Sequence, residues 1–139
     1  MKSTIYIAAF LTLVLFSCKY EDGPNFSLLS KKTRVANIWF IDKVIENGND
    51  ETDAYKTTFV NYKLEIKKDD TYTLTYRLLN ISETREEGTW KFSDDKSKFI
   101  LKENGQTVEN TWTILRLKNN SFWSKQKTGN DDYELRLKD

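Results

Sequence analysis

The feature that most constrains the fold of this chain is the alternation of apolar and polar residues through most of its length. Tyr62, Leu64 and Ile66 share one parity, and polar residues occupy the positions between them. The same alternation returns in residues 71–78 and 133–137. A period of two places successive side chains on opposite faces of a β-strand. Because each strand then has one apolar face, the strands must close around a shared interior.

Clusters of turn-forming residues separate these strands at intervals of about 11 to 14 residues, which is typical of an all-β sandwich or barrel. Seven turns imply eight strands, and no intervening segment is long enough for a crossover helix, so neighbours should pair antiparallel. Asn104-Gly105 is the strongest signal for a tight type I′ hairpin, because both residues accept positive φ. The seven clusters lie at 47–50, 68–70, 80–82, 93–95, 104–105, 119–120 and 129–131.

Two strands depart from clean alternation. Residues 38–45 are apolar on both parities, and the strand that follows Asn110 changes parity near Ile114 and Leu115. A β-bulge inserts one extra residue and so reverses the parity of a strand. The sequence therefore predicts a bulge near Ile114-Leu115.

A short helix is predicted before the first strand, within residues 26–35. Ser27 and Ser30 are alternative N-caps, since a serine hydroxyl can accept a hydrogen bond from the first turn. A helix of this length is marginal alone, so it should pack against the strands that follow. Its expected apolar side consists of Phe26, Leu29 and Leu28.

The first 18 residues indicate where the protein works. Lys2 supplies a positive start, residues 5–16 form an apolar run broken only by Thr12, and Cys18 is the chain's only cysteine. This length suits a secretory signal, whereas a membrane-spanning helix needs about 20 apolar residues. Leu15-Phe16-Ser17-Cys18 resembles the lipobox of bacterial lipoproteins, which implies that Cys18 is lipidated. The alternative is an unpaired thiol beyond an uncleaved anchor, which is unusual in an exported protein.

These features divide the chain into a lipoprotein signal peptide (1–17), a lipidated cysteine with a tether (18–25) and one barrel domain (26–139). Lys19 follows the cysteine where an aspartate is associated with retention in the inner membrane, so the resemblance favours the outer membrane. The charged start 19–22 resembles the export signals of surface lipoproteins of Bacteroidota. A solvated linker is the alternative, because so short a charge cluster is weakly specific.

The composition argues against several classes of function. The predicted signal peptide holds one of the 22 basic residues and none of the 21 acidic ones, so the remainder has no formal net charge. A neutral chain gives no electrostatic reason to bind nucleic acid. There is no histidine, and Cys18 is assigned to the lipid, so the usual nucleophile pairs are excluded. Residues 47–53 carry several oxygen ligands but lack the EF-hand spacing. We predict neither an enzyme nor a metal or cofactor site.

Three local features, taken in order, resemble the lipocalin-like domain of small lipoproteins of Bacteroidota. They are Asn37-Ile38-Trp39, Glu87-Gly88-Thr89-Trp90-Lys91-Phe92 and Tyr133-Glu134-Leu135-Arg136-Leu137. Asn37 stands where lipocalins usually carry a glycine. The resemblance implies an eight-stranded antiparallel up-and-down barrel with a short N-terminal helix at one end. It implies little about activity, because fold transfers better than function.

In a meander of eight strands both ends of the barrel lie at one rim, so the connections at 47–57, 80–82, 104–105 and 129–131 share the opposite, distal rim. Buried phenol hydroxyls need partners, so a tyrosine-rich distal half suits a wet or ligand-filled cavity. A filled interior is the alternative, because eight strands leave a space that side chains alone can occupy. The candidate ligand-binding residues are Tyr62, Tyr76, Leu78, Val108 and Tyr133.

Two functional hypotheses follow. The first is a binding module for a small apolar or amphipathic ligand, held at the outer membrane of the bacterial cell envelope by acylated Cys18. The second is an accessory subunit with a filled barrel, which docks another envelope protein through its distal loops. Residues 47–57 form the longest of these loops. In both hypotheses the protein is expected to be a monomer.

Overall fold

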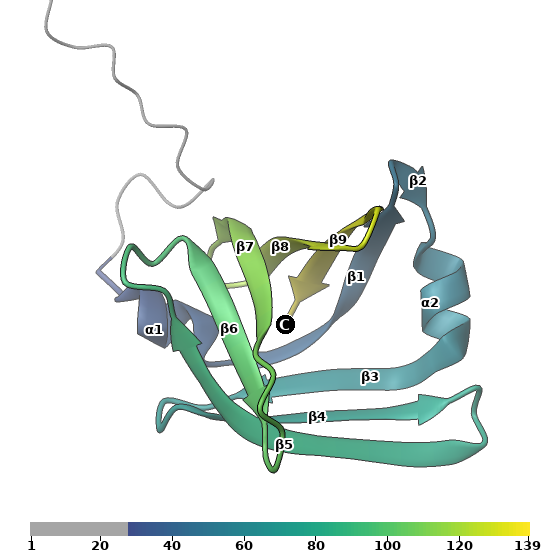
Figure 1. The fold of residues 1–139 in the computed structure, drawn as a ribbon, viewed down its shortest axis with the longest axis horizontal. Helices are drawn as coiled ribbons and strands as arrows, with labels where there is room; N and C mark the ends of the chain where they lie inside the picture. Colours follow the sequence, from purple (N-terminus) through teal and green to yellow (C-terminus); the bar gives the residue numbers. More distant parts are fainter. Residues whose placement is uncertain (1–27) are drawn as a thin grey trace, which may run out of the picture.

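A single antiparallel sheet closes on itself to form a barrel (Figure 1). This computed structural model describes residues 28–139. The predicted signal peptide and tether, with Cys18, Phe26 and Ser27, lie outside the described residues. The elements are α1 (Lys31–Val35), β1 (Ile38–Glu46), β2 (Asn49–Asp50), α2 (Thr52–Thr58), β3 (Phe59–Ile66), β4 (Thr71–Leu78), β5 (Ser82–Phe92), β6 (Lys98–Glu103), β7 (Asn110–Leu117), β8 (Ser121–Thr128) and β9 (Asp131–Lys138).

The sheet follows the order of the chain, apart from the two-residue strand β2. Its strand order is β2-β1-β3-β4-β5-β6-β7-β8-β9, every pair is antiparallel, and β1 also pairs with β9. That last pairing closes a barrel of eight long strands. The predicted eight-stranded antiparallel up-and-down barrel with a short N-terminal helix is therefore confirmed.

The strand irregularities coincide with shifts in the pairing register. The register between β7 and β8 shifts between Ile114 and Arg116, which confirms the bulge predicted near Ile114-Leu115. A second shift, between Ile41 and Lys43, interrupts the pairing of β1 with β9. This shift brings Ile41 and Val44 to the same buried side, which explains why β1 is apolar on both parities.

The turn prediction at Asn104-Gly105 is wrong. Only Gly105 has a positive φ there, at 79°, and six residues separate β6 from β7. The two-residue turn with positive φ at both positions lies instead at Asn47 (51°) and Gly48 (83°), between β1 and β2. An Asn-Gly pair permits a type I′ turn, but the length of the flanking strands decides whether a tight hairpin forms.

Helix α1 is shorter than predicted and packs through its last residue. The Ser30 hydroxyl accepts a hydrogen bond from the Thr33 amide at 3.1 Å, so Ser30 is the N-cap. Val35 is fully buried, and its carbonyl accepts a hydrogen bond from the Trp39 indole at 2.8 Å. The prediction that Leu28 and Leu29 form the apolar side is wrong, because both side chains are exposed. Val35 is the residue that packs against the barrel instead.

Both ends of the described chain lie at the rim that carries α1. Asn37, just before β1, donates hydrogen bonds to the Asp139 carboxylate at 3.3 Å and to the Asn119 carbonyl at 3.4 Å. Lys32 of α1 pairs with Asp70 in the turn between β3 and β4, at 2.6 Å. The helix therefore ties several turns of this rim together and leaves the opposite rim open.

None of the helices formed by residues 28–139 is long and apolar enough to cross a membrane.

Aromatic rings fill the half of the barrel next to α1. The Trp39 ring lies 5.8 Å from that of Phe122, and Phe122 meets Phe99 edge-on at 5.3 Å. Trp90 extends the cluster, with its ring centroid 5.5 Å from that of Phe99. Ring pairs of this kind add about 0.5–1.5 kcal/mol each beyond the burial of their area. The centre of the hydrophobic core therefore lies in the half of the barrel that the chain ends share.

The connection from 47 to 58 is not the simple loop that the sequence predicted, because it holds β2 and α2. Thr52 fixes the start of α2, and its hydroxyl accepts a hydrogen bond from the Val44 amide at 3.0 Å. The Glu51 amide donates to the Val44 carbonyl at 3.0 Å. Both bonds use backbone groups of Val44, which lies beyond the pairing of β1 with β3 at Ile38 and Trp39. The helix is thereby held over the distal rim (Figure 1).

Candidate functional site: the distal pocket

A pocket of about 420 Å³ opens at the distal end of the barrel, beside α2. It begins where the hydrophobic core ends, since Val44, Leu74 and Leu135 belong to both. Its walls come from β1, β3, β4, β7, β8 and β9 and from α2. The lining residues are Ile41, Val44, Tyr55, Phe59, Tyr62, Leu74, Tyr76, Trp112, Gln126, Thr128, Tyr133, Glu134 and Leu135.

The pocket is lined mainly by aromatic side chains. Tyr55 on α2 lies 5.6 Å from Phe59 at the start of β3, and Phe59 meets Tyr76 edge-on at 5.2 Å. This row of rings joins the helix to the barrel wall. Trp112 and Tyr62 contribute further aromatic surface. Apolar walls with a few polar groups are typical of sites for small organic ligands.

The polar groups of the pocket converge at its mouth. Gln126, Tyr133 and Glu46 are successive cross-strand neighbours on β8, β9 and β1, so their side chains share the inner face. The Tyr55 hydroxyl donates a hydrogen bond to the Glu46 carboxylate at 3.3 Å. Gln126 is held by the Thr111 carbonyl at 3.2 Å. The mouth therefore presents an amide and two phenols above an apolar floor, and the Glu46 carboxylate is bonded to one of these phenols.

Three of the five predicted residues surround the pocket. Tyr62, Tyr76 and Tyr133 line it, as their shared parity with the inner face predicted. Leu78 does not line it, because it lies at the end of β4 and is 41% exposed. Val108 is 76% exposed in the connection between β6 and β7, since the expected tight hairpin is absent.

Sequence reasoning missed several lining residues, including Tyr55, Phe59 and Trp112. Tyr55 belongs to a segment interpreted as a loop, and nothing in its spacing showed that it would turn inward. Trp112 carried a usable signal, because it has the same parity as Ile114 before the predicted bulge. That parity places its ring on the inner face of β7.

Burial keeps the phenols of this region protonated. It is the main cause that raises the pKa of Tyr55 to about 12, with the Glu46 carboxylate adding to it. Burial also raises the pKa of Tyr62, and the charge of Glu86 contributes. The pKa of Tyr133 is raised by burial and by Glu46. These hydroxyls are therefore hydrogen-bond donors at any physiological pH.

The raised pKa of Tyr55 predicts a loss of stability at alkaline pH. An unfolded phenol ionises near pH 10, whereas Tyr55 in the folded protein stays protonated until about pH 12. Its contribution to the free energy of unfolding is therefore complete below pH 10 and is lost as the pH rises to 12. Between these pH values only the unfolded state releases the proton. Chemical denaturation at pH 9, 10, 11 and 12 measures this. In Tyr55→Phe the free energy of unfolding should fall less between pH 10 and 12. An identical fall in that variant would contradict the raised pKa of Tyr55.

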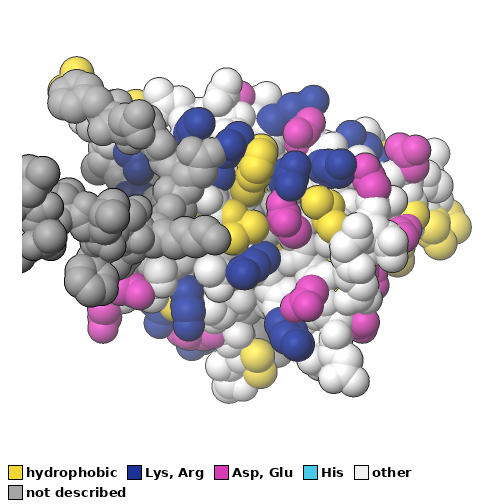
Figure 2. Space-filling view, turned by 90° about the horizontal axis from the view of Figure 1, so that it is seen from above, with side chains coloured by type: hydrophobic (Ala, Val, Ile, Leu, Met, Phe, Trp, Pro, Cys, Tyr) yellow, Lys and Arg dark blue, Asp and Glu magenta, His cyan; other side chains and the backbone are white. Residues whose placement is uncertain are grey.

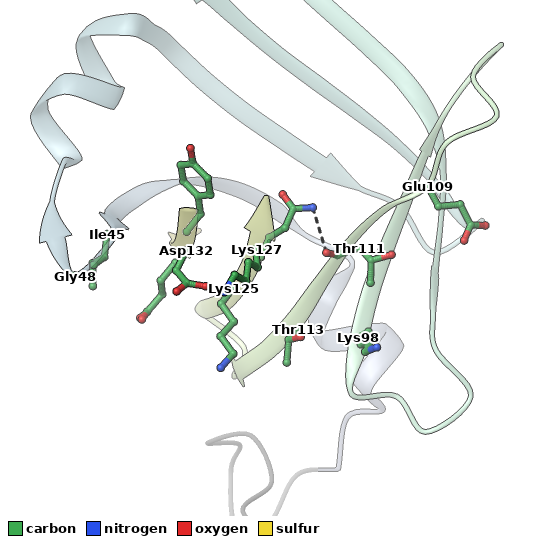
Figure 3. A pocket seen from close by; sticks show the side chains of 12 residues that line it. Ile45, Gly48, Lys98, Glu109, Thr111, Thr113, Lys125, Lys127 and Asp132 are labelled. Carbon is green, nitrogen blue, oxygen red and sulfur yellow. Dashed lines mark hydrogen bonds between the residues drawn. The ribbon is translucent and has the colours of Figure 1, made fainter. Parts of the chain in front are cut away.

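A second, larger hollow of about 810 Å³ lies mostly against outward-facing side chains and shares Gln126, Tyr133 and Glu134 with the distal pocket (Figure 3). Lys98, Thr113 and Lys125 are cross-strand neighbours on β6, β7 and β8, and Figure 3 shows them on one side of the sheet. The surrounding outer face mixes acidic and basic side chains (Figure 2). Long exposed charged side chains have high rotamer entropy and form poor walls for a ligand. We therefore place the candidate site in the smaller, apolar pocket.

The oxygen ligands of residues 47–53 serve the fold. Asp50 accepts hydrogen bonds from the Thr52 amide and hydroxyl, at 3.1 and 2.5 Å, and pairs with Lys43 at 3.0 Å. The Thr52 contacts and then Lys43 lower the pKa of Asp50 to about 2. Within residues 28–139, no group of three or more cysteine, aspartate or glutamate side chains is placed to hold a metal ion.

Comparison with known proteins supports the fold and adds nothing about chemistry. No known family profile matches the sequence, and no curated protein matches it. Among solved structures, the chain is similar to an uncharacterized protein from Bacteroides eggerthii, with a TM-score of 0.54 and 9% identity. The similarity covers 75% of this chain and 98% of that protein. At this identity the likeness shows the fold alone, an all-β barrel of antiparallel strands.

Proposed function

We propose that the protein is a non-enzymatic binding module whose barrel takes a small apolar or amphipathic ligand through its distal rim. One observation carries the proposal: the barrel is filled with rings at one end and hollow at the other. The hollow of about 420 Å³ lies within the few hundred cubic ångströms of ordinary ligand sites. Its apolar walls suit the body of such a ligand, and the phenols at its mouth suit a polar end.

Docking of another envelope protein through residues 47–57 is less well supported. A docking loop should present side chains outward, whereas Tyr55 turns toward the barrel and Thr52 is used by the backbone of β1. The pocket is also at odds with the filled barrel that this alternative assumed. We therefore favour ligand binding.

The site of action is a proposal that rests on the sequence. The lipobox-like residues 15–18 favour acylation of Cys18 and anchoring in the outer membrane, where two or more acyl chains give stable attachment. The described chain starts at the rim that carries α1. A tether leading into that rim would point the distal pocket away from the bilayer. Membership of the lipocalin-like lipoproteins is part of the same proposal.

Filling the pocket should weaken binding without unfolding the barrel. Leu74 lines the pocket, so Leu74→Trp places an indole in the space that the ligand would use. The measurement is the fluorescence of N-phenyl-1-naphthylamine, an uncharged probe, titrated into the full-length protein in nonionic micelles with empty micelles as the blank. We expect a saturable fluorescence enhancement with the wild type. The dissociation constant of the variant should be at least about tenfold higher, since a loss of 1.4 kcal/mol in binding free energy is a tenfold change.

Thr75→Trp is the matched control. Thr75 is the next residue of β4 and has the opposite parity, so its indole adds the same bulk to the outer face. Binding should be unchanged in this variant. If both variants bind the probe as the wild type does, or if the wild type gives no saturable signal, the proposed binding function fails.

The anchor can be tested separately. If Cys18 is acylated, Cys18→Ser should shift the protein from the detergent phase of a phase separation to the aqueous phase, or leave it unprocessed. Mass spectrometry of the wild type should show the mass of the added acyl chains. A Cys18→Ser protein that stays in the outer-membrane fraction with the same added mass would refute the lipoprotein proposal. The pocket proposal does not depend on this result.

A further inference from the structure

The charges of the barrel are sorted between its two faces. The inner face carries the acidic side chains of Glu46, Glu86 and Glu103. Each lies an even number of positions from a buried residue of its own strand, which is Val44, Trp90 or Phe99 in turn. Within the described part of the chain, no lysine or arginine lines the distal pocket. On the outside, basic and acidic residues are interspersed (Figure 2).

The inward carboxylates Glu46 and Glu86 are held by phenols, whereas Glu134, the carboxylate that lines the pocket, is paired with Arg136 at 2.7 Å. Glu46 accepts a hydrogen bond from Tyr55 at 3.3 Å and lies beside Tyr133. Glu86 accepts a hydrogen bond from the Tyr72 hydroxyl. No ion pair joins Glu46 or Glu86 to a cation among residues 28–139. A neutral phenol orients a carboxylate without cancelling its charge, so each remains attractive to a cation.

Aromatic rings line the same space. The rings of Tyr55, Phe59 and Tyr76 form a continuous row, and Tyr62 and Trp112 also line the pocket. The face of an aromatic ring is electrostatically negative, so it attracts an organic cation and repels an anion. Aromatic cages of this type are the usual protein sites for quaternary ammonium groups.

We propose that the ligand of the distal pocket is an organic cation, a quaternary or protonated alkylamine whose charged head lies between Glu46 and the tyrosine faces. This inference rests on the proposed binding function and narrows it to one ligand class. The apolar part of the ligand occupies the floor between Leu74 and Leu135. Fatty acids and other anionic amphiphiles are disfavoured, because no lysine or arginine lines the pocket and Arg136 is already paired with Glu134.

Three small probes of similar shape separate charge from shape. Choline is the cation, 3,3-dimethylbutan-1-ol is its uncharged carbon isostere, and 3,3-dimethylbutanoate is the corresponding anion. All three dissolve in water without forming micelles. Their dissociation constants for the full-length protein in nonionic micelles are measured by ligand-observed NMR. We expect choline to bind at least about tenfold more tightly than the alcohol, and the anion to bind most weakly.

The variant Glu46→Gln keeps the shape of the side chain and removes its charge. It should reduce the preference for choline over the alcohol, while binding of the alcohol stays unchanged. Glu83→Gln, on an exposed position of β5, is the matched control and should leave the preference intact. Equal binding of choline and the alcohol, or tighter binding of the anion, overturns the cation inference and leaves the binding function standing. If none of the three probes binds and N-phenyl-1-naphthylamine does not either, both proposals fail.

Discussion

Replacing Trp39 by alanine should lower the free energy of unfolding by about 4 kcal/mol, within the range seen when a buried tryptophan is truncated. The Trp39 side chain is fully buried in the aromatic cluster, and its ring contacts that of Phe122. Its indole also donates to the Val35 carbonyl at 2.8 Å, which ties α1 to the barrel. The variant therefore loses packing and leaves a buried carbonyl without its partner. Urea denaturation followed by circular dichroism measures the loss.

Trp123→Ala is the matched control. Trp123 lies on the outer face of β8, with the guanidinium groups of Arg116 and Arg136 over its ring at 3.7 and 4.2 Å. Contacts of this kind near the surface contribute about 0.5–1 kcal/mol each, so the control should cost about 1–2 kcal/mol. Equal losses in the two variants would show that the core is not centred on Trp39.

The substitution Gly88→Ala should be nearly as damaging, at about 3 kcal/mol. A β-carbon at Gly88 would lie 2.1 Å from the Lys102 carbonyl oxygen and 2.7 Å from the Tyr72 ring. The first of these atoms is backbone, so β5 and β6 must separate to admit the methyl group. The loss is measured by denaturation, and faster hydrogen exchange of the amides in β6 should accompany it.

Gly105→Ala is the control for Gly88. Gly105 has a φ of +79°, and a β-carbon added to it would have no atom within 4 Å, so the substitution tests backbone conformation without crowding. Its expected cost is about 1 kcal/mol, since alanine adopts positive φ with modest strain. If Gly105→Ala is the more destabilising of the two, close strand packing is not the reason for glycine at 88.

The strands could be predicted because alternation depends only on which face is buried. Tyr62, Leu64 and Ile66 share a parity whatever the neighbouring strands do. Turn signals were less reliable, as the two Asn-Gly pairs show. Both allow a type I′ turn, and only the pair at 47–48 forms one, because strand pairing on either side decides the loop length.

The site was partly predictable for the same reason. Parity placed Tyr62, Tyr76 and Tyr133 on the inner face, where they line the pocket. Tyr55 could not be placed, because its position depends on the contacts of α2 with Val44 and Glu46 of β1. The existence of the pocket could not be inferred either, since it depends on whether side chains from opposite strands meet.

The most direct test of the central claim is where a ligand binds. Backbone NMR spectra of the protein, recorded during titration with N-phenyl-1-naphthylamine, locate the affected amides. The proposed function predicts shifts concentrated at Tyr62 and Tyr76 and along α2, with Lys98 and Glu109 of the outer hollow unchanged. Shifts concentrated at Lys98 and Glu109, or no saturable shifts at all, would contradict it.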